Sequence, residues 1–303
     1  MSMPPPGHDW LVPDWPAPAH VRALCTTRAG GVSAAPYGAL NLGDHVGDDP
    51  QAVQANRRIL GDALRWGDGQ TARPVFLRQV HGWQVAALGP ETPDGTEADA
   101  CTATGPGVAC TIMVADCLPV LLTDARGTRV AAAHAGWRGL AGQDGRGVLE
   151  AALECFRPPA QSELGHDAIK NVASASQALE SVAEPAADSW GDCIAWLGPC
   201  IGPTAFEVGP EVRAAFCDAL PAADRNFSPQ GGGKYLADLA GLARQRLQSL
   251  GVDRVYGNDG NDGSAAWCTV GQPSRFFSHR YGSAFGGSGR FAACIWLDRA
   301  ADG

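Results

Sequence analysis

The sequence predicts an α+β fold with mixed β-sheets, organised as one main domain. Two observations support this prediction. Short apolar segments with strand character follow one another directly as often as they alternate with helical segments, unlike the regular alternation of a doubly wound parallel sheet. The chain of 303 residues is also 45% hydrophobic and only 18% charged, so it has enough apolar material to bury a large core.

The first half of the chain contains most of the predicted strands. Residues 1–20 are rich in proline and tryptophan, and we expect an extended arm that precedes the domain at 21–303. Asp49-Pro50 begins a predicted helix that runs through Leu64, because proline is favoured in a first helical turn. Apolar runs predict strands at 21–27, 75–80, 84–88, 108–115, 118–123 and 128–135.

The second half of the chain contains two longer predicted helices and one segment of different composition. We expect a helix from Gly139 to about Phe156, and an amphipathic helix over 235–250 where leucines recur every three or four residues. Residues 157–192 are rich in Ala, Ser and acidic residues, which predicts a surface insertion without catalytic residues, with a short helix around 168–181. Apolar strands are expected at 193–197 and 290–297.

Charge and targeting signals narrow the class of protein. A net charge of −9 and a pI of about 5.2 disfavour a nucleic-acid or anionic-membrane binder, but are compatible with a small anionic substrate held by a few arginines. The N-terminus lacks the pattern of a signal peptide, and no apolar run approaches the roughly 18 residues of a membrane helix. We therefore expect a cytoplasmic protein with ten reduced cysteines and no evident obligate protein partner.

Three segments place a histidine or cysteine at the end of a predicted strand, beside small or turn-forming residues. They contain His81 in RQVHG, Cys117 in ADCLP and His134 in AHAGWRG. A strand end holds a side chain rigidly, and glycine lets a ligand approach the backbone. Two imidazoles and one thiolate suit a zinc ion with an open fourth position for water. Because the three residues are far apart in sequence, spacing alone leaves open a buried cysteine and two hydrogen-bonded histidines.

Longer motifs identify a resemblance to the YfiH/laccase-domain family. In chain order these motifs are RQVHG, VADCLPVLL, AAAHAGWRGL, WLGPCIGPTAFEVG, YLADLAGLARQRL, and FFSHRYG followed by GRFAACIWL. The segment TTRAGGVSAAPYGALNLGDHVGDDP fits the same family, so the resemblance covers roughly residues 20–298. Members of this family were once described as polyphenol oxidases or multicopper oxidases.

The resemblance implies a fold, a metal site and an activity. The family fold is a layered α/β/β/α arrangement with mixed sheets, and its motifs imply one zinc ion held by His81, Cys117 and His134. The implied activity is that of a zinc-dependent purine nucleoside phosphorylase. Such an enzyme cleaves adenosine, inosine and methylthioadenosine with phosphate to the free base and the pentose 1-phosphate, which is ribose 1-phosphate for adenosine and inosine. Family members are also reported as adenosine deaminases and as factors in peptidoglycan quality control.

Phosphorolysis requires a phosphate ion held close to the sugar, and arginine binds such an ion through two parallel hydrogen bonds. The candidate arginines are Arg28, Arg78, Arg138 and Arg280. Arg138 and Arg280 are best placed by their motifs, and Asn41 is a candidate contact to the sugar or base. Each arginine could instead form a surface salt bridge. We expect His279 in the pocket wall, and Cys200 and Cys268 in core packing.

Three other interpretations remain open from the residues. Cys117 with His134 or His81 could form the nucleophile and base of a cysteine hydrolase. The same residues with Met113 as a weak axial ligand could bind copper, although a full laccase needs more histidines than the chain has left. A zinc-stabilised binding or peptidoglycan-editing module is the third. The H-x-E and P-C-x-x-C signatures of known zinc deaminases are absent, so a deaminase would need another acid/base group.

Overall fold

A computed structural model describes residues 7–64, 71–157, 190, 192–259, 266–282, 284 and 286–298. The expected surface insertion at 157–192, including its short helix, lies almost entirely outside the described residues. Residues 7–20 run without regular helix or strand, as expected of an extended arm. Leu11 forms two backbone hydrogen bonds of 2.8 Å with Cys25, and Trp10 is buried against the four-stranded sheet described below.

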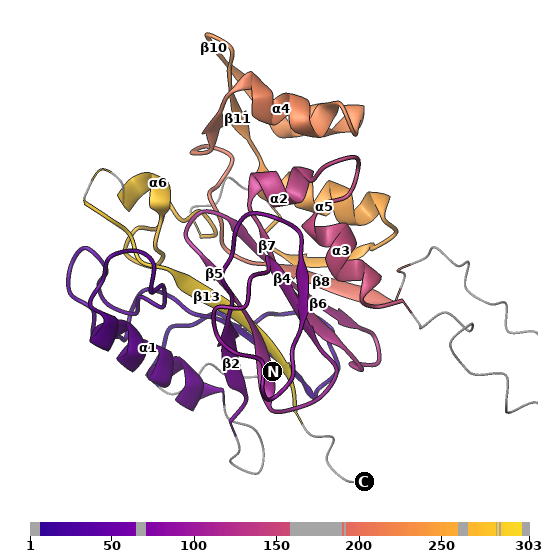
Figure 1. Cartoon of the computed structure of the whole chain (residues 1–303). Helices are drawn as coiled ribbons and strands as arrows, with labels where there is room; N and C mark the ends of the chain where they lie inside the picture. The colour runs from indigo at the N-terminus through magenta and orange to yellow at the C-terminus, as the bar shows by residue number, and fades with distance from the viewer. Residues whose placement is uncertain are drawn as a thin grey trace, which may run out of the picture.

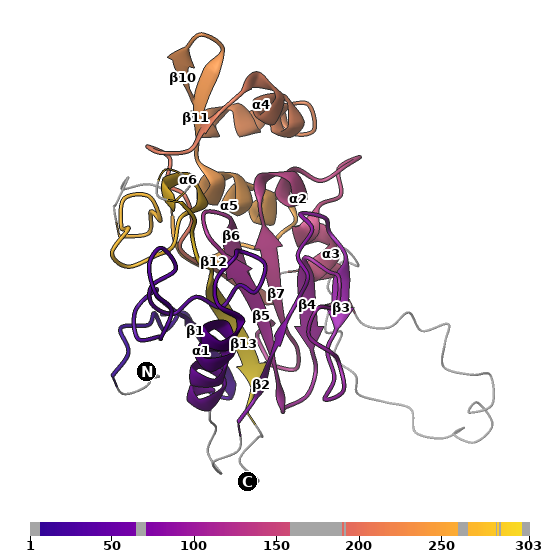
Figure 2. The ribbon, with the colours of Figure 1, turned by 60° about the vertical axis from the view of Figure 1, so that its left-hand side comes forward.

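Two mixed β-sheets pack face to face, with helices covering their outer faces (Figures 1 and 2). The four-stranded sheet has the order β1 (Val21–Cys25), β13 (Phe291–Leu297), β5 (Val108–Val114), β2 (Arg73–Phe76). The six-stranded sheet has the order β12 (Arg254–Gly257), β8 (Cys193–Leu197), β6 (Leu118–Asp124), β7 (Val130–Ala135), β4 (Ala100–Ala103), β3 (Val85–Ala87). Each sheet combines parallel and antiparallel pairs. The α+β prediction with mixed sheets is confirmed.

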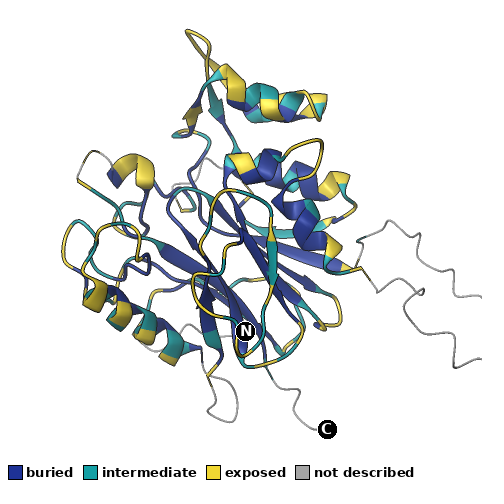
Figure 3. Cartoon of the chain, viewed as in Figure 1, coloured by how far each residue is buried: buried dark blue, intermediate teal, exposed yellow. Residues whose placement is uncertain are grey.

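The helices form the outer layers, and a small third sheet projects beyond them. Helix α1 (Pro50–Ala63) covers the four-stranded sheet, with its buried side against the strands and its exposed side outward (Figure 3). Helices α2 (Trp137–Ala141), α3 (Val148–Glu154) and α5 (Leu239–Ser249) cover the six-stranded sheet (Figure 2). The remaining elements are β9 (Glu207–Val208), α4 (Pro210–Cys217), the 3-10 helix η2 (Pro221–Asn226), β10 (Phe227–Gly231), β11 (Lys234–Ala237) and α6 (His279–Gly282). None of the helices in the described ranges has the length and apolar character needed to cross a membrane.

The alternation of side chains along β7 determines where its histidine lies. Ala131, Ala133 and Ala135 pack against the helical layer, whereas Val130 and Ala132 face the four-stranded sheet. Because successive strand residues point to opposite faces, His134 lies on the same face as Val130 and Ala132, at the end of the core between the sheets. The strand sequence VAAAHA therefore points a histidine between the two sheets.

Two predicted helices differ from the structure. The helix expected over 139–156 is two helices, α2 and α3, separated by a turn in which Gly142 adopts φ +67° and ψ −159°, a conformation that other residues avoid. The helix expected over 235–250 begins only at Leu239, because 234–237 pairs with β10 as a hairpin. Asp238 then caps the helix by accepting a hydrogen bond of 2.9 Å from the Gly241 backbone. The predicted helix at 50–64 is confirmed to within one residue.

Gly142→Ala is expected to destabilise the protein by about 2–4 kcal/mol. A Cβ atom at this position would overlap the backbone carbonyl of Arg146 in addition to straining the backbone. Gly145→Ala is the matched control, because Gly145 also has a positive φ but open space around it, and should cost only about 1 kcal/mol. Urea unfolding measures both changes. Equal losses in the two variants would contradict the role assigned to Gly142.

Candidate active site

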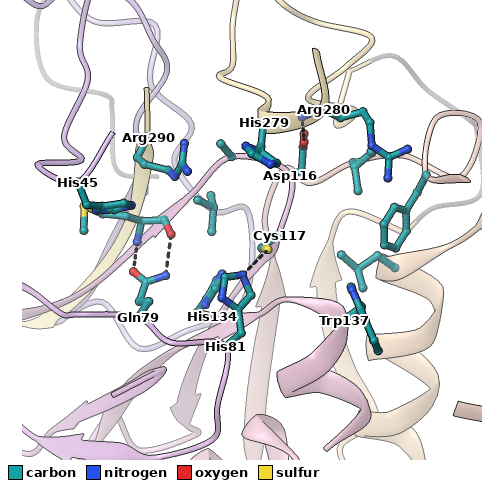
Figure 4. Close-up of a pocket in the computed structure, with 16 residues that line it drawn as sticks. His45, Gln79, His81, Asp116, Cys117, His134, Trp137, His279, Arg280 and Arg290 are labelled. Atoms are coloured by element: carbon teal, nitrogen blue, oxygen red, sulfur yellow. Dashed lines mark hydrogen bonds between the residues drawn. The ribbon is translucent and has the colours of Figure 1, made fainter. Parts of the chain in front are cut away.

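A pocket of about 360 Å³ opens at one end of the two sheets, between the four-stranded sheet and the helical layer (Figure 4). His81, Cys117 and His134 line it together. Their ligating atoms all lie within 4.8 Å of one another, and Cys117 Sγ is 3.9 Å from His81 Nε2. The structure thus brings together the three residues that the sequence singled out as metal ligands. In the described part of the chain, this is the one cluster of three such side chains that could hold a metal ion.

Strand pairing brings two of the ligands together. In the antiparallel pair of β6 and β7, Leu118 lies opposite Ala135. Continuing this register places Cys117 opposite Gly136, two residues beyond His134. A Cβ atom on Gly136 would lie 3.0 Å from Cys117 Sγ and 3.0 Å from a carbon of the His81 ring. The glycine after His-Ala in the HAGWRG motif is therefore required by the close approach of the other two ligands.

His81 is held in a strained loop after β2. Its φ of +62° is uncommon for a residue other than glycine, and Asp116, next to Cys117, has φ +90°. Gly139 in helix α2 lies directly against this loop, where a Cβ atom would be 2.7 Å from the carbonyl oxygen of Gly82. The second glycine of the motif thus lets α2 pack on the loop that carries His81.

Asp99, directly before β4, links the loop at 80–82 to His134. Its carboxylate accepts hydrogen bonds from the backbone N–H groups of Val80 (3.1 Å), His81 (2.9 Å) and Gly82 (2.7 Å). It also lies 2.8 Å from Nδ1 of His134, which leaves Nε2 of that ring for the cluster. Asp99 is fully buried. The sequence analysis missed this residue, and the only available signal was an acidic side chain at the start of an apolar strand.

Electrostatic coupling within the cluster favours a thiolate. Burial by itself would raise the pKa of the Cys117 thiol, but the charges and hydrogen bonds of His134 and His81 lower it to about 6. Burial would likewise lower the pKa of His134, but the Cys117 charge and the Asp99 hydrogen bond raise it to about 9. Burial opposes ionisation of Asp99 as well, yet hydrogen bonding to His134 and to the backbone leaves its pKa lowered. The sulfur is thus prepared to be a metal ligand or a nucleophile.

The two sides of the pocket differ in character (Figure 4). Trp137, Phe206 and Leu239 form an apolar side that belongs to the helical layer and its connections. His45, Gln79 and Arg290 lie on the other side, which belongs to the four-stranded sheet and its loops. The metal-ligating cluster lies between them. His279 also lines the pocket, as expected.

Of the predicted phosphate-binding residues, the structure places Arg280 in the pocket lining. Its backbone N–H donates to Asp116 Oδ2 at 2.6 Å, and its guanidinium donates to the carbonyl of Glu207 at 3.1 Å. Asp116 also accepts a hydrogen bond of 2.5 Å from Thr269. These contacts fix the loop that carries Cys117 to the start of helix α6.

The other predicted contacts are not among the residues that line the pocket. Arg28 donates to the carbonyls of Gly38 and Pro273, and exposed Arg78 forms an ion pair with exposed Glu97. Arg138 is exposed and stacks on the Trp137 ring, with its guanidinium 4.4 Å from the ring centre. Their contacts with phosphate remain predictions that the geometry does not favour.

Asn41 is buried and does not line the pocket. It supports a residue that does, because its side chain accepts a hydrogen bond of 2.8 Å from the Arg290 backbone. His45, Gln79 and Arg290 are pocket residues that the sequence analysis did not find. Cys200 and Cys268 are buried in packing, as expected.

Comparison with known proteins identifies the family. The family model described as multi-copper polyphenol oxidoreductase laccase matches residues 22–169 and 168–298. The chain belongs to the YfiH/laccase-domain family. Two curated relatives are the proteins named purine nucleoside phosphorylase from Pseudomonas aeruginosa, 45% identical, and purine nucleoside phosphorylase YfiH from Escherichia coli, 42% identical. Each match covers 95% of this chain and 98% of the relative.

Solved structures of the YfiH/laccase-domain family share the fold. A crystal structure of a Neisseria meningitidis protein has a TM-score of 0.74 at 42% identity, covering 96% of this chain and 99% of that one. The hypothetical protein YfiH of Bacillus licheniformis has a TM-score of 0.72 at 25% identity, covering 92% and 93%. The resemblance predicted from the motifs is confirmed along nearly the whole chain.

Asp99→Asn is expected to weaken metal retention by about 10–100-fold and to lower the free energy of unfolding by about 2–4 kcal/mol. The amide N–H₂ group would face one or more of the donors that now bond to the carboxylate, which are three backbone N–H groups and the His134 ring. Glu97→Gln is the control, because its ion pair with Arg78 is exposed and should contribute less than about 1 kcal/mol. Metal content after dialysis and urea unfolding report the two effects. An Asp99→Asn protein that retained metal like the wild type would contradict the role of this carboxylate.

Proposed function

We propose that this chain is a zinc-dependent purine nucleoside phosphorylase. The observation that carries the proposal is the His81–Cys117–His134 cluster on the floor of a pocket. It occurs in a chain that is 45% and 42% identical to two proteins named purine nucleoside phosphorylase. The proposed reaction transfers the pentose of adenosine, inosine or methylthioadenosine from the base to phosphate. Adenosine deamination is a proposed second activity.

The donor set fits a zinc ion. Zinc at about 2.0–2.3 Å from tetrahedral nitrogen and sulfur ligands needs donors about 3.3–3.8 Å apart. The 3.9 Å between Cys117 and His81 is close to this spacing, and the other pairs lie within 4.8 Å. Asp99 fixes the His134 ring in the manner usual for metal-bound histidine. A zinc ion held there would supply a Lewis acid at the pocket floor.

The surroundings of the cluster do not favour copper. A blue-copper site adds a weak axial methionine to two histidines and one cysteine. On β5, Cys110, Ile112 and Val114 face the six-stranded sheet, whereas Met113 packs in the core on the side of α1. Met113 lines the pocket, but its side chain packs on the α1 side of β5 and not on the side toward the six-stranded sheet. We do not propose an oxidase.

The pocket suits a nucleoside in size and in chemistry. Its volume of about 360 Å³ lies within the range of small-molecule sites, about 300–1,000 Å³. A purine is flat and aromatic, and the side formed by Trp137 and Phe206 offers aromatic surface on which it can stack. A base stacked on that side would place its sugar over the cluster. The polar side of the pocket would then remain open for phosphate.

The second candidate function is that of a cysteine hydrolase. A peptidoglycan-editing enzyme that uses Cys117 would belong to this class. The supporting observation is the lowered pKa of Cys117, about 6, beside a histidine held by a buried aspartate. The two functions make opposite demands on the sulfur, because a nucleophile needs a free thiolate. Activity that survives zinc removal and is abolished by iodoacetamide would favour the hydrolase.

Products formed from adenosine test the function directly. The zinc-loaded protein should release adenine only when phosphate is present, together with ribose 1-phosphate in equal amount. Inosine formed without phosphate would indicate deamination. Adenine with free ribose, independent of phosphate, would indicate hydrolysis and would contradict the phosphorylase proposal.

Cys117→Ala and His134→Ala are expected to lose zinc and phosphorolysis together, with activity falling by at least about 100-fold. Each substitution removes one of three protein ligands. Cys217→Ser, at the end of α4 and outside the pocket lining, is the control and should keep both properties. Zinc content by mass spectrometry and adenine release are measured on the same preparation. A zinc-free variant with full activity would overturn the proposed metal dependence.

A further inference from the structure

Arg290 is a pocket arginine without an ionic partner among the described residues. Its guanidinium donates to the backbone carbonyls of Ser288 and Gly289, at 3.0 Å each, and both acceptors are neutral. In the ranges that the structure describes, no carboxylate lies within ion-pair distance of it. Burial lowers the pKa of Arg290, and the charges of Cys117 and Asp116 act against this shift. A partly buried cation on a pocket wall without a carboxylate partner points to an anionic ligand.

The fold holds Arg290 firmly in this position. The residue directly precedes β13, and its backbone pairs on both sides: its N–H donates to Asn41 Oδ1 at 2.8 Å, and its carbonyl accepts from Leu42 at 3.0 Å. Gly43 lies against the side chain, where a Cβ atom would be 2.7 Å from Arg290 Cγ. Such support lowers the conformational entropy that binding would cost.

The neighbours of Arg290 complete a polar side of the pocket. Gln79 is fixed by two hydrogen bonds to the Met113 backbone, of 2.8 and 2.9 Å, and His45 lines the same side (Figure 4). His45 lies 3.5 Å from the Asp44 carboxylate. The pKa of His45 is lowered, mainly by burial and next by the charge of Arg290. The negative charges that act on Arg290 are those of Cys117 and Asp116. Arg290 thus faces the metal ligands from the side opposite Trp137 (Figure 4).

We propose that Arg290 is the main anion-binding residue of this pocket and that it holds inorganic phosphate, the nucleophile, beside the metal cluster. This assignment rests on the proposed phosphorylase function. In the reaction, the bond between the sugar C1′ and the base nitrogen breaks, and its electron pair leaves with the base. A phosphate oxygen forms the new bond to C1′, and the proton of HPO₄²⁻ ends on the departing base. Atoms and charge balance without an oxidant or reductant.

The test compares Arg290→Gln, Arg290→Lys, Arg138→Gln and Arg225→Gln in the zinc-loaded protein. Arg225 is exposed in η2, outside the pocket lining, and is the control. Titration calorimetry with inorganic phosphate alone gives Kd, and adenosine cleavage gives the KM of phosphate and of adenosine separately. Arg290→Gln should raise both phosphate constants at least 10-fold and leave the adenosine KM within about threefold. The phosphate constants of Arg290→Lys should lie between those of the wild type and Arg290→Gln, because lysine keeps the charge but cannot form two parallel hydrogen bonds.

The outcomes separate this inference from the proposed function. Unchanged phosphate Kd and KM in Arg290→Gln, or a shift found only in Arg138→Gln, would overturn the inference and leave the phosphorylase intact. Arg290-dependent phosphate binding without adenine release would refute the function and support the anion site. Acetate that displaced phosphate equally well would indicate a carboxylate site and overturn the phosphate assignment. If Arg290→Gln fails to fold, the phosphate constants of Arg290→Lys decide, and values equal to wild type would overturn the inference.

Discussion

The buried carboxylate of Asp99 is the interaction on which the site depends. It accepts hydrogen bonds from three consecutive N–H groups of the loop at 80–82 and lies within hydrogen-bond distance of the His134 ring. The loop follows β2 of the four-stranded sheet, whereas Asp99 directly precedes β4 and His134 lies in β7, both strands of the six-stranded sheet. One carboxylate therefore joins the two sheets where their core ends. Burying a charge is costly, and four hydrogen bonds use its full accepting capacity. The distance between the metal ligands is in this way tied to the packing of the sheets.

The layered fold also explains why the pocket has two unlike sides. The helical layer contributes Trp137 and Leu239 from the segments that cover the six-stranded sheet. The four-stranded sheet contributes Gln79 and Arg290 from its loops and strand starts. Because the cluster lies where the two layers meet, a ligand that spans the pocket contacts apolar surface at one end and a cation at the other. A nucleoside and a phosphate ion differ in this same way.

Much of the fold and the metal cluster could be predicted from the sequence, because both depend on local patterns. Apolar runs marked the strands, and the small or turn residues around His81, Cys117 and His134 marked strand ends. Asp99 and Arg290 could not be found in this way, since their roles depend on which segments become neighbours. Two of the predicted arginines do not line the pocket for a related reason: Arg78 is paired with Glu97, and Arg28 is held by backbone carbonyls. An arginine can bind a ligand only if it lines the pocket and is not already paired with a carboxylate of the protein. A short sequence motif shows neither property.

The charges in the pocket would couple a metal bound at the cluster to an anion bound at Arg290. Without a metal, the Cys117 thiolate and a protonated His134 would largely cancel each other's charge, so the cluster would add little to the attraction of Arg290 for phosphate. A divalent ion bound by one thiolate and two neutral imidazoles would give these groups a charge of about +1, which the Asp99 carboxylate beside His134 would offset in part and to which Arg290 would add. Metal and phosphate would then favour each other's binding, since any coupling between two sites is reciprocal. The cluster on the pocket floor and the arginine on its wall would therefore act as one binding unit.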